Sequence, residues 1–305
     1  YYIVSPLQAA KFRQTQIHAN KTDALDCKNI ARVYYGTKLR HHRNEAEEYR
    51  RMRELNRYYE DILVHLRKHK VSFKAKLDIV FPNLDQYFKS TSMYTNAVLE
   101  LLKLYPHPKM ILGKTSNSVL TKLSKKASSH SKIYLNKIVE KFVDCASTTY
   151  SGCNPEDVDV EIIVRLIESI QSCNQEAEEI LGKLVELAQK TPNYKSILSI
   201  VGVGENLAAR IVSELGDIER FDNRNQLISY AGLDPRIRQS GAQSGDHLRI
   251  SKKGNKRLRC LLYLAATCNY RLKKNDRLYE FNQKKRQQSN RLNSKDDNIA
   301  TAHKL

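Results

Sequence analysis

The sequence lacks closely spaced cysteines and long apolar runs, and each absence excludes a class of protein. No two cysteines form a C-x-x-C pair, so the spacing typical of zinc sites is missing. A disulfide framework is not expected in a chain of 305 residues, and the cysteines are interpreted as reduced thiols of a cytosolic protein. No apolar run approaches the length of a membrane-spanning helix, and no signal peptide is recognisable. We therefore expect a cytoplasmic protein without a membrane partner.

Acidic residues are also scarce relative to basic ones. The chain has 52 Lys and Arg against 33 Asp and Glu, which gives a formal net charge of +19. Such an excess is typical of proteins that bind nucleic acid, and a generally basic soluble surface is the alternative. With 41% hydrophobic residues, a chain of this length is expected to form two or three domains with hydrophobic cores.

A glycine-containing turn divides the stretch from Ser196 to Leu215. An apolar run leads into Gly202-Val203-Gly204, after which a helical apolar stripe restarts. The two glycines permit a tight turn, as in a helix-hairpin-helix. Backbone N–H groups of Gly202 and Gly204 would then face a phosphate at a helix N-terminus. A plain corner between two helices is the alternative, and G-x-G alone does not distinguish them.

A strongly basic loop follows between residues 236 and 259. It contains one acid, Asp246, and two Ser-Gly pairs that begin at Ser240 and Ser244. A serine hydroxyl beside cations suits attack on a phosphodiester, because the cations can hold the phosphate and stabilise the transition state. The alternative is a solvated loop that only grips nucleic acid. The cations expected to contact nucleic acid are Arg236, Arg238, Arg249, Lys252, Lys253, Lys256, Arg257 and Arg259.

The order of residues across this loop resembles one known family. YAGLDP, four residues, SG and then RISKKGNKRLR resemble the C-terminal domain of the IS110 family of insertion-sequence transposases. The resemblance implies a bridge-RNA-guided recombinase whose serine attacks DNA and becomes covalently joined to it. The family spacing places that serine four residues beyond Pro235, which selects Ser240 rather than Ser244. The matching residues are Ala231, Gly232, Leu233, Pro235, Ser240, Gly241, Ile250, Ser251, Lys252, Gly254, Leu258 and Arg259.

Two carboxylates occur together near the start of the chain. Asp23 and Asp26 have i,i+3 spacing behind a possible helix cap at Thr22 or Asp23, so both would lie on one helix face. Oxygen ligands of this kind suit Mg²⁺ or Mn²⁺, whereas a capping Asp plus a surface Asp is the alternative. Lys21-Thr22-Asp23 followed by Asp26 resembles the end of the family's RuvC-like domain, which implies a catalytic and metal-binding role for both acids.

The family's first two acids have no counterpart in this sequence. We therefore expect a fragment that begins inside the acidic domain, ends within the family's last helix, and is inactive by itself. In the family, acidic and serine domains of different protomers form a composite site. The resemblance thus implies a homo-oligomer, a dimer or tetramer, that binds donor DNA, target DNA and a bridge RNA.

Two periodic runs predict coiled-coil helices. Apolar residues alternate in steps of 3 and 4 from Met52 to Leu66 and again from Ile163 to Leu187. The two helices can pair within the chain or across a dimer. The Ser- and Lys-rich stretch 114–132 between them is expected to be a solvated connector, or else to touch a phosphate backbone.

Taken together, these patterns predict a mainly α-helical fold. Two rival functions remain: a non-catalytic nucleic-acid-binding coiled-coil protein, and an acid-only RuvC-like junction nuclease. The expected parts are the end of a RuvC-like α/β domain (1–45), a helical and coiled-coil region (46–190), a serine transposase domain with the helix-hairpin-helix (191–275), and a basic tail with a truncated final helix (276–305).

Overall fold

The computed structural model describes residues 2, 4, 6–14, 22–37, 46–235, 239–240, 243–244, 250–274, 276–287 and 293–305. These residues are mainly helical, which confirms the mainly α-helical character that the sequence predicts. Within the described ranges, β structure is confined to an isolated bridge at Tyr2, the bridge between Pro235 and Ile250, and the strands β1 (Gln239–Ser240) and β2 (Gln243–Ser244). The two strands pair antiparallel, with Ser240 opposite Gln243.

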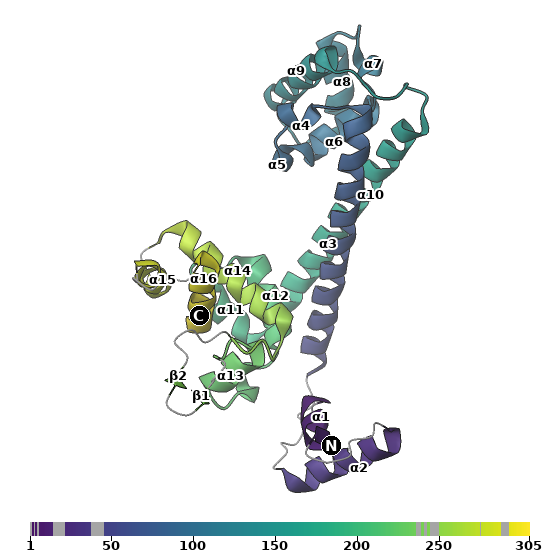
Figure 1. Ribbon diagram of the computed structural model, residues 1–305. Coiled ribbons are helices and arrows are strands. Elements are labelled where there is room, and N and C mark those ends of the chain that lie inside the picture. The colour runs from purple at the N-terminus through teal and green to yellow at the C-terminus, as the bar shows by residue number, and fades with distance from the viewer. Residues whose placement is uncertain are drawn as a thin grey trace.

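Two long helices form the central axis of the molecule (Figure 1). Helices α3 (Glu47–Val80) and α10 (Val158–Gln189) run antiparallel along one another, and we call this pair the stalk. Their contacts include an ion pair between Lys76 Nζ and Asp159 Oδ1 at 2.6 Å. The two apolar stripes predicted from the sequence therefore meet within one chain. Buried stripe residues include Met52, Ile62 and Leu66 of α3 and Ile163, Ile170, Ala177 and Leu184 of α10.

A helical unit that we call the head, residues 81–157, caps one end of the stalk (Figure 1). Its core joins the stalk through packed aromatic rings, among them Phe73 of α3 and Tyr94 of the head with centroids 5.9 Å apart. The Ser- and Lys-rich stretch is not a bare connector, because Val119 and Leu123 are buried and fold part of it into a helix. The head helices are α4 (Leu84–Tyr87), α5 (Ser90–Met93), α6 (Asn96–Leu104), α7 (Pro108–Ile111), α8 (Ser116–Lys126) and α9 (Lys132–Thr148).

A second helical unit packs against the opposite half of the stalk. Its core includes Met52 of α3 and Leu184 of α10, so both stalk helices contribute to it. The last helix packs on α14 and buries Ala302 in the same core. The elements of this C-terminal unit are α11 (Pro192–Leu198), α12 (Glu205–Leu215), the 3₁₀ helix η1 (Ile218–Arg220), α13 (Arg224–Ala231), β1, β2, α14 (Lys256–Leu272), α15 (Arg277–Gln287) and α16 (Ser294–Lys304).

The N-terminal residues form a small pair of helices beyond the lower end of the stalk (Figure 1). Helix α1 (Pro6–Gln14) packs on α2 (Asp23–Gly36). Thr22 caps α2, because its Oγ1 accepts a hydrogen bond from the Leu25 amide at 3.3 Å, as the sequence predicts for one of its two candidates. Among the described residues, no helix has both the length and the apolar content that crossing a membrane requires.

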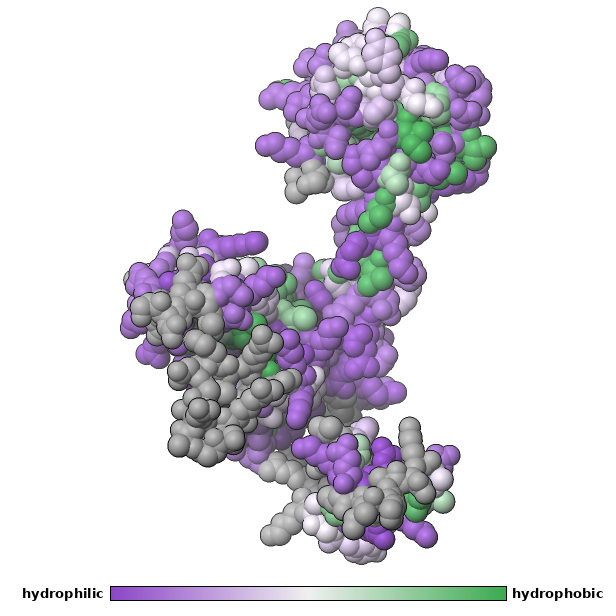
Figure 2. Space-filling view, viewed as in Figure 1, coloured by the Kyte–Doolittle hydropathy of each residue, from purple (hydrophilic) through white to green (hydrophobic). Residues whose placement is uncertain are grey.

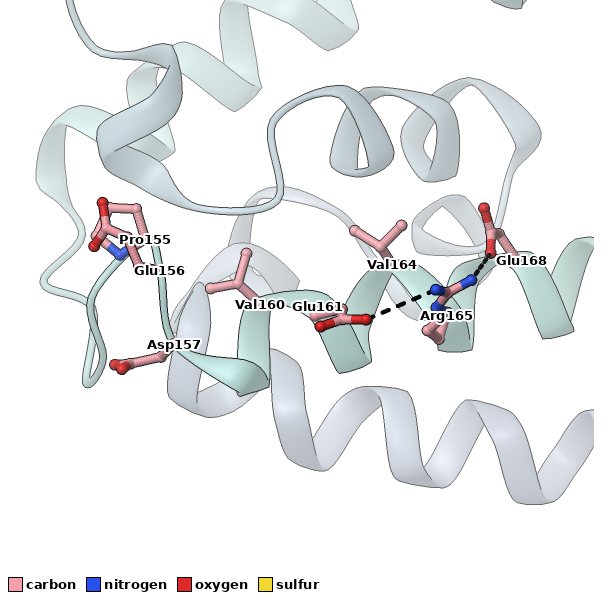
Figure 3. A pocket seen from close by; sticks show the side chains of 8 residues that line it. All are labelled: Pro155, Glu156, Asp157, Val160, Glu161, Val164, Arg165 and Glu168. Carbon is pink, nitrogen blue, oxygen red and sulfur yellow. Dashed lines mark ion pairs between the residues drawn. The ribbon is translucent and has the colours of Figure 1, made fainter.

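The visible surface is largely hydrophilic, with small apolar patches on the head and upper stalk (Figure 2). One shallow groove lies at the start of α10, and acids make up half of the residues that line it (Figure 3). There Arg165 lies between Glu161 and Glu168 and pairs with them at 3.7 and 3.8 Å. Lys103 also reaches Glu168, at 3.3 Å. These acids are thus partly neutralised from within the chain.

Candidate nucleic-acid interface

The two ends of the basic loop are held together by backbone hydrogen bonds. The Ser251 amide donates to the Asp234 carbonyl at 2.7 Å, and the Asn255 amide donates to the Tyr230 carbonyl at 2.7 Å. We call the paired segments 230–235 and 250–255 the clasp. Its far end is a β-bridge between Pro235 and Ile250. The chain between these two residues, which includes Ser240, therefore leaves and returns at one point.

Side chains and glycines of the sequence pattern build this clasp. Ser251 Oγ donates to Asp234 Oδ1 at 2.6 Å and accepts from the Lys253 amide at 3.2 Å. Gly232 ends α13 in the left-handed conformation, with φ 67°, where glycine is favoured. The pattern residues thus have clear structural roles, in addition to any contact with nucleic acid.

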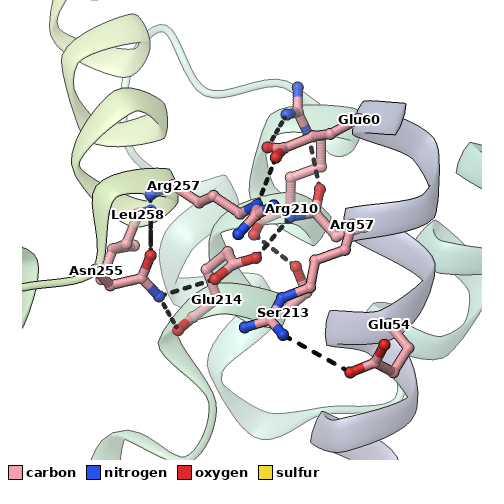
Figure 4. A network of polar contacts seen from close by, with 10 residues as sticks. Glu54, Arg57, Glu60, Arg210, Ser213, Glu214, Asn255, Arg257 and Leu258 are labelled. Carbon is pink, nitrogen blue, oxygen red and sulfur yellow. Dashed lines mark hydrogen bonds and ion pairs between the residues drawn. The ribbon is translucent and has the colours of Figure 1, made fainter. Parts of the chain in front are cut away.

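A polar network fastens the clasp to the stalk (Figure 4). Glu60 of α3 accepts from Arg210 Nη2 at 3.0 Å and from Arg257 Nε at 2.7 Å. Asn56, one turn away, accepts from Arg210 Nε at 3.0 Å and donates to Glu214 Oε1 at 3.0 Å. Asn56 and Glu214 are fully buried, so each depends on these partners.

Asn255 connects this network to the start of α14 (Figure 4). Its Nδ2 donates to Glu214 Oε2 at 2.8 Å, while its Oδ1 accepts from the Arg257 and Leu258 amides at 2.9 and 3.1 Å. These amides belong to the first turn of α14, so Asn255 is the helix cap. The cap therefore already uses two N–H groups that could otherwise contact a phosphate.

The cations predicted to bind nucleic acid divide into two sets. Arg257 donates a hydrogen bond to Glu60, and this bond raises the Arg257 pKa above its ordinary value. Arg259 Nη1 donates to the Ala231 carbonyl at 2.7 Å. Lys252, Lys253 and Lys256 are instead exposed, and no ion pair joins them to the described part of the chain. Lys252 and Lys253 of the clasp and Lys256 at the start of α14 therefore keep positive charge exposed to solvent.

Three predicted cations, Arg236, Arg238 and Arg249, lie outside the described residues. Ser240 is described through its backbone alone, as the second residue of β1. Its role as a nucleophile therefore stays a prediction, although the clasp that anchors its loop is described. The rival Ser244 ends β2 of the same small hairpin.

The glycine turn at residues 202–204 packs against α14. Gly202 has φ 96°, and a Cβ there would lie 2.5 Å from the Asn269 nitrogen. Asn269 is buried and its Nδ2 donates to the Val201 carbonyl at 2.9 Å. Close packing alone thus explains the glycine at 202. Gly204 faces open space and precedes α12, and a shallow hollow beside it contains Arg271.

The two N-terminal acids lie on the first turn of α2. Asp26 is ion-paired with Arg13 of α1, with Arg13 Nη1 3.0 Å from Asp26 Oδ1, and Asp23 is exposed. Their oxygens suit Mg²⁺, but the described residues contain no cluster of three or more His, Cys, Asp or Glu. These two acids alone are too few for a metal site, and Arg13 already supplies the positive charge beside Asp26. In Figure 1, α2 lies apart from β1 and β2.

The stalk network was not predicted from the sequence. Glu60 and Arg257 are 197 positions apart, and Asn56 and Glu214 are 158 apart. No local spacing signals that these residues meet. The one local sign was Glu214 itself, an acid within a helix whose neighbours Ile211, Val212 and Leu215 are apolar.

Comparison with known proteins gives two family matches at the two ends of the chain. Residues 194–281 match the transposase family IS116/IS110/IS902, and residues 1–82 match a DEDD transposase domain of IS110 type. Together the matched ranges exceed half of the chain. Both the acids on α2 and the clasp lie within them, whereas most of the head lies outside both.

Individual relatives give the same result over shorter stretches. The chain is 39% identical over 115 residues to y4rJ of Sinorhizobium fredii, which is named as a transposase, covering 37% of this chain and 28% of y4rJ. It is 37% identical over 93 residues to the transposase of insertion sequence IS1111A from Coxiella burnetii, covering 30% and 25%. It is 30% identical over 103 residues to the pilin gene-inverting protein of Moraxella lacunata, covering 32% of each.

The aligned region therefore spans between 25% and 32% of these relatives' own length. The family match over residues 194–281 nevertheless includes the whole residue pattern from Ala231 to Arg259. The chain belongs to the IS110/IS116/IS902 family of insertion-sequence transposases.

Proposed function

We propose that this chain is part of a DNA recombinase that moves an insertion sequence by cutting and rejoining DNA through Ser240. The observation that carries the proposal is the clasp. Its hydrogen bonds hold both ends of the Ser240 loop at one point, and the Glu60 network ties that point to the stalk. A loop that is anchored at both ends can present its serine to a phosphate repeatedly in one place.

The reaction is a transesterification at a DNA phosphate. Ser240 Oγ loses its proton and forms a bond to phosphorus, while one P–O bond to a deoxyribose breaks. The departing sugar oxygen takes up a proton, so no oxidant or other reactant is consumed. Reversal of the same step by another DNA end rejoins the strand and frees the serine. Positive charge from Lys252 and Lys253, with Arg238 and Arg249 of the loop, stabilises the phosphate during each exchange.

The acids of α2 serve the same reaction in this proposal. Asp23 and Asp26 contribute oxygen ligands to a Mg²⁺ or Mn²⁺ site that needs further ligands, and Asp26 must then leave Arg13. Such a metal would supply electrostatic stabilisation of the reacting phosphate. Because α2 and the clasp lie apart in Figure 1, acids and serine would meet between chains of a dimer or tetramer.

Two kinds of nucleic acid take part in this proposal. Donor and target DNA are the substrates, and a bridge RNA pairs with both of them. The exposed lysines of the clasp and the turn at Gly202–Gly204, with Arg271 beside it, supply contacts to phosphates rather than to bases. Sequence choice would then come from the RNA.

The test is a trapped protein–DNA adduct, formed by the full-length protein with RNA and both DNAs. We expect the adduct to map to Ser240 and to disappear in Ser240→Ala with RNA binding unchanged. Ser244→Ala is the matched control, since Ser244 lies across the same hairpin, and it should keep the adduct. A non-catalytic binding protein would give no adduct, and a nuclease that uses only acids would cut DNA without one. An adduct that survives Ser240→Ala would contradict the assignment.

A further inference from the structure

The head carries a basic surface far from the clasp. Helices α8 and α9 form a hairpin, and the residues that join them are 127–131. Between residues 105 and 143 the only acid is Glu140, which accepts a hydrogen bond from Asn136 at 2.8 Å. We call the exposed lysines of this hairpin the head lysines. They are Lys122, Lys125, Lys126, Lys132, Lys137 and Lys141.

The head lysines have no ion-pair partner within the described part of the chain. Three other lysines of the head and stalk do have one, since Lys74, Lys76 and Lys103 each pair with an acid. Lys125, Lys126 and Lys132 flank the turn of the hairpin, so three positive charges gather at its tip. Like charges repel, and a surface of this kind is stabilised by an anionic partner.

The neighbouring side chains favour a phosphate backbone. Exposed hydroxyl groups of Ser128 and Ser129 lie in the turn, and hydroxyl and ammonium groups are the usual donors to phosphate oxygens. Single-stranded nucleic acid is generally held by aromatic rings that stack on bases. The described aromatic rings nearest the tip, His130 and Tyr134, lie against each other with centroids 5.2 Å apart. This arrangement fits a duplex better than a single strand.

A second copy of the chain is a weaker candidate for this partner. The acidic groove at the start of α10 would have to bind the head lysines, but Glu161 and Glu168 already pair with Arg165 (Figure 3). Asp159 likewise pairs with Lys76. These pairs within the chain therefore reduce the charge complementarity between two copies.

The stalk separates the head from the polar network that anchors the clasp. Glu60, which holds Arg257 of α14, and Val80, where α3 enters the head, lie about 30 Å apart along one continuous helix. One turn of B-DNA is of similar length, about 34 Å. A duplex beside the Glu60 end of this span can thus extend to the start of the head within about one turn.

We infer that the head lysines form a second binding surface for double-stranded DNA, which contacts phosphates flanking the DNA at the clasp. Most of the head lies outside both family matches, so neither match assigns a role to this surface. The inference needs DNA as the substrate of the proposed function, but it does not depend on the serine chemistry.

The experiment compares DNA affinity of two quadruple variants of the whole chain across a salt series. One replaces Lys122, Lys125, Lys126 and Lys132 with Gln. The control replaces Lys68, Lys183, Lys190 and Lys195, exposed lysines of the stalk and α11, and removes the same charge. Binding is measured by fluorescence anisotropy with a DNA duplex of about 30 bp, near three helical turns. Thermal unfolding confirms that both variants are folded.

We expect the head variant to bind at least about tenfold more weakly at low salt, with the slope of log K against log salt smaller by about 3. The control should change the slope by less than about 1. Equal effects of the two variants would show that only net charge matters. An unchanged slope in the head variant would show that the head lysines do not contact DNA phosphates. Either outcome overturns the inference.

Further measurements distinguish duplex DNA from other partners, and DNA binding from the serine chemistry. A loss confined to duplex RNA or to single-stranded DNA, or a loss of self-association in sedimentation with unchanged DNA binding, would contradict the inference. Ser240→Ala with the head intact should keep the full salt slope. The head variant should still form the covalent adduct at saturating DNA, so failure of the inference and failure of the proposed function are distinguishable.

Discussion

Gly232 and Gly254 lie backbone against backbone in the clasp. A Cβ added to Gly254 would come within 2.6 Å of the Gly232 nitrogen and 2.3 Å of the Tyr230 carbonyl oxygen. Real Cβ atoms do not approach backbone this closely, so only glycine fits at 254 without a shift of the main chain. Both ends of the Ser240 loop therefore depend on this contact.

Gly254→Ala should open the clasp and destabilise the fold. The added methyl group meets main-chain atoms rather than a flexible side chain, so we expect the free energy of unfolding to fall by about 3 kcal/mol. The measurement is urea unfolding followed by circular dichroism. Gly182→Ala is the matched control: its Cβ meets open space in α10, and it should raise stability by about 0.5–1 kcal/mol. A neutral Gly254→Ala would show that the clasp is not tightly packed.

Arg257→Ala should act on stability and Lys256→Ala on binding. Arg257 donates to Glu60, so its loss should cost about 1–2 kcal/mol of unfolding free energy. Lys256 is exposed and should change stability by less than about 0.5 kcal/mol. Denaturant unfolding of the two variants separates these roles. Equal stability of both would mean that the ion pair with Glu60 contributes nothing to the fold.

Replacing Lys252, Lys253 and Lys256 together with Ala should weaken binding of nucleic acid uniformly across sequences. Each phosphate contact adds about 0.9 to the salt slope, so three contacts predict a slope smaller by about 2–3. Filter binding of unrelated duplexes over a salt series measures this slope. An unchanged slope, or a loss limited to one sequence, would mean that these lysines do not contact the backbone.

Asn56→Ala should be among the most destabilising polar substitutions in the chain. It leaves Glu214 Oε1 without its donor and Arg210 Nε without its acceptor, in a position that water does not reach. We expect a loss of about 3 kcal/mol, measured by thermal or urea unfolding. Gln175→Ala, which removes an exposed bond to Glu179, should cost less than about 0.5 kcal/mol. Comparable losses would refute the importance of burial here.

His303 should make the C-terminal unit less stable at acidic pH. Burial, together with Arg224 and Lys304 nearby, lowers the His303 pKa below 6.5, and Asp234 opposes this effect weakly. The unfolded chain therefore binds the proton more readily, and stability falls as the pH drops from about 6.5 through the folded pKa. His303→Gln should flatten this part of the pH–stability curve relative to wild type. Parallel curves for the two proteins would show that His303 does not titrate differently on folding.

Sequence patterns predicted the helices better than they predicted the clasp. The 3- and 4-residue steps place Met52 and Leu184 on buried faces, because helical period and burial follow from the same geometry. The cap at Thr22 was likewise readable from its local neighbours. The pairing of α3 with α10 inside one chain was left open, since an apolar stripe does not name its partner.

The sequence indicated candidate site residues by their type but not how the fold arranges them. Arg257 and Arg259 were expected to face nucleic acid, yet the fold gives them Glu60 and the Ala231 carbonyl as partners. Charge in a sequence does not tell whether a cation is already neutralised from across the fold. The role of Asn56 could not be predicted either, because its partners Arg210 and Glu214 lie on α12, far from it in the sequence. Burial of Val119 was also missed, because serines and lysines on both sides masked a short helical stripe.

The unbroken course of α3 has a mechanical consequence. Phe73 and Leu77 belong to the core of the head, while Tyr49 and Met52 belong to the core of the C-terminal unit. One rigid helix thus has each end embedded in a different core, and α10 repeats this connection in the opposite direction. The head and the C-terminal unit cannot rotate independently without disrupting one of the two cores. The stalk therefore transmits torque between them and keeps them at a fixed spacing.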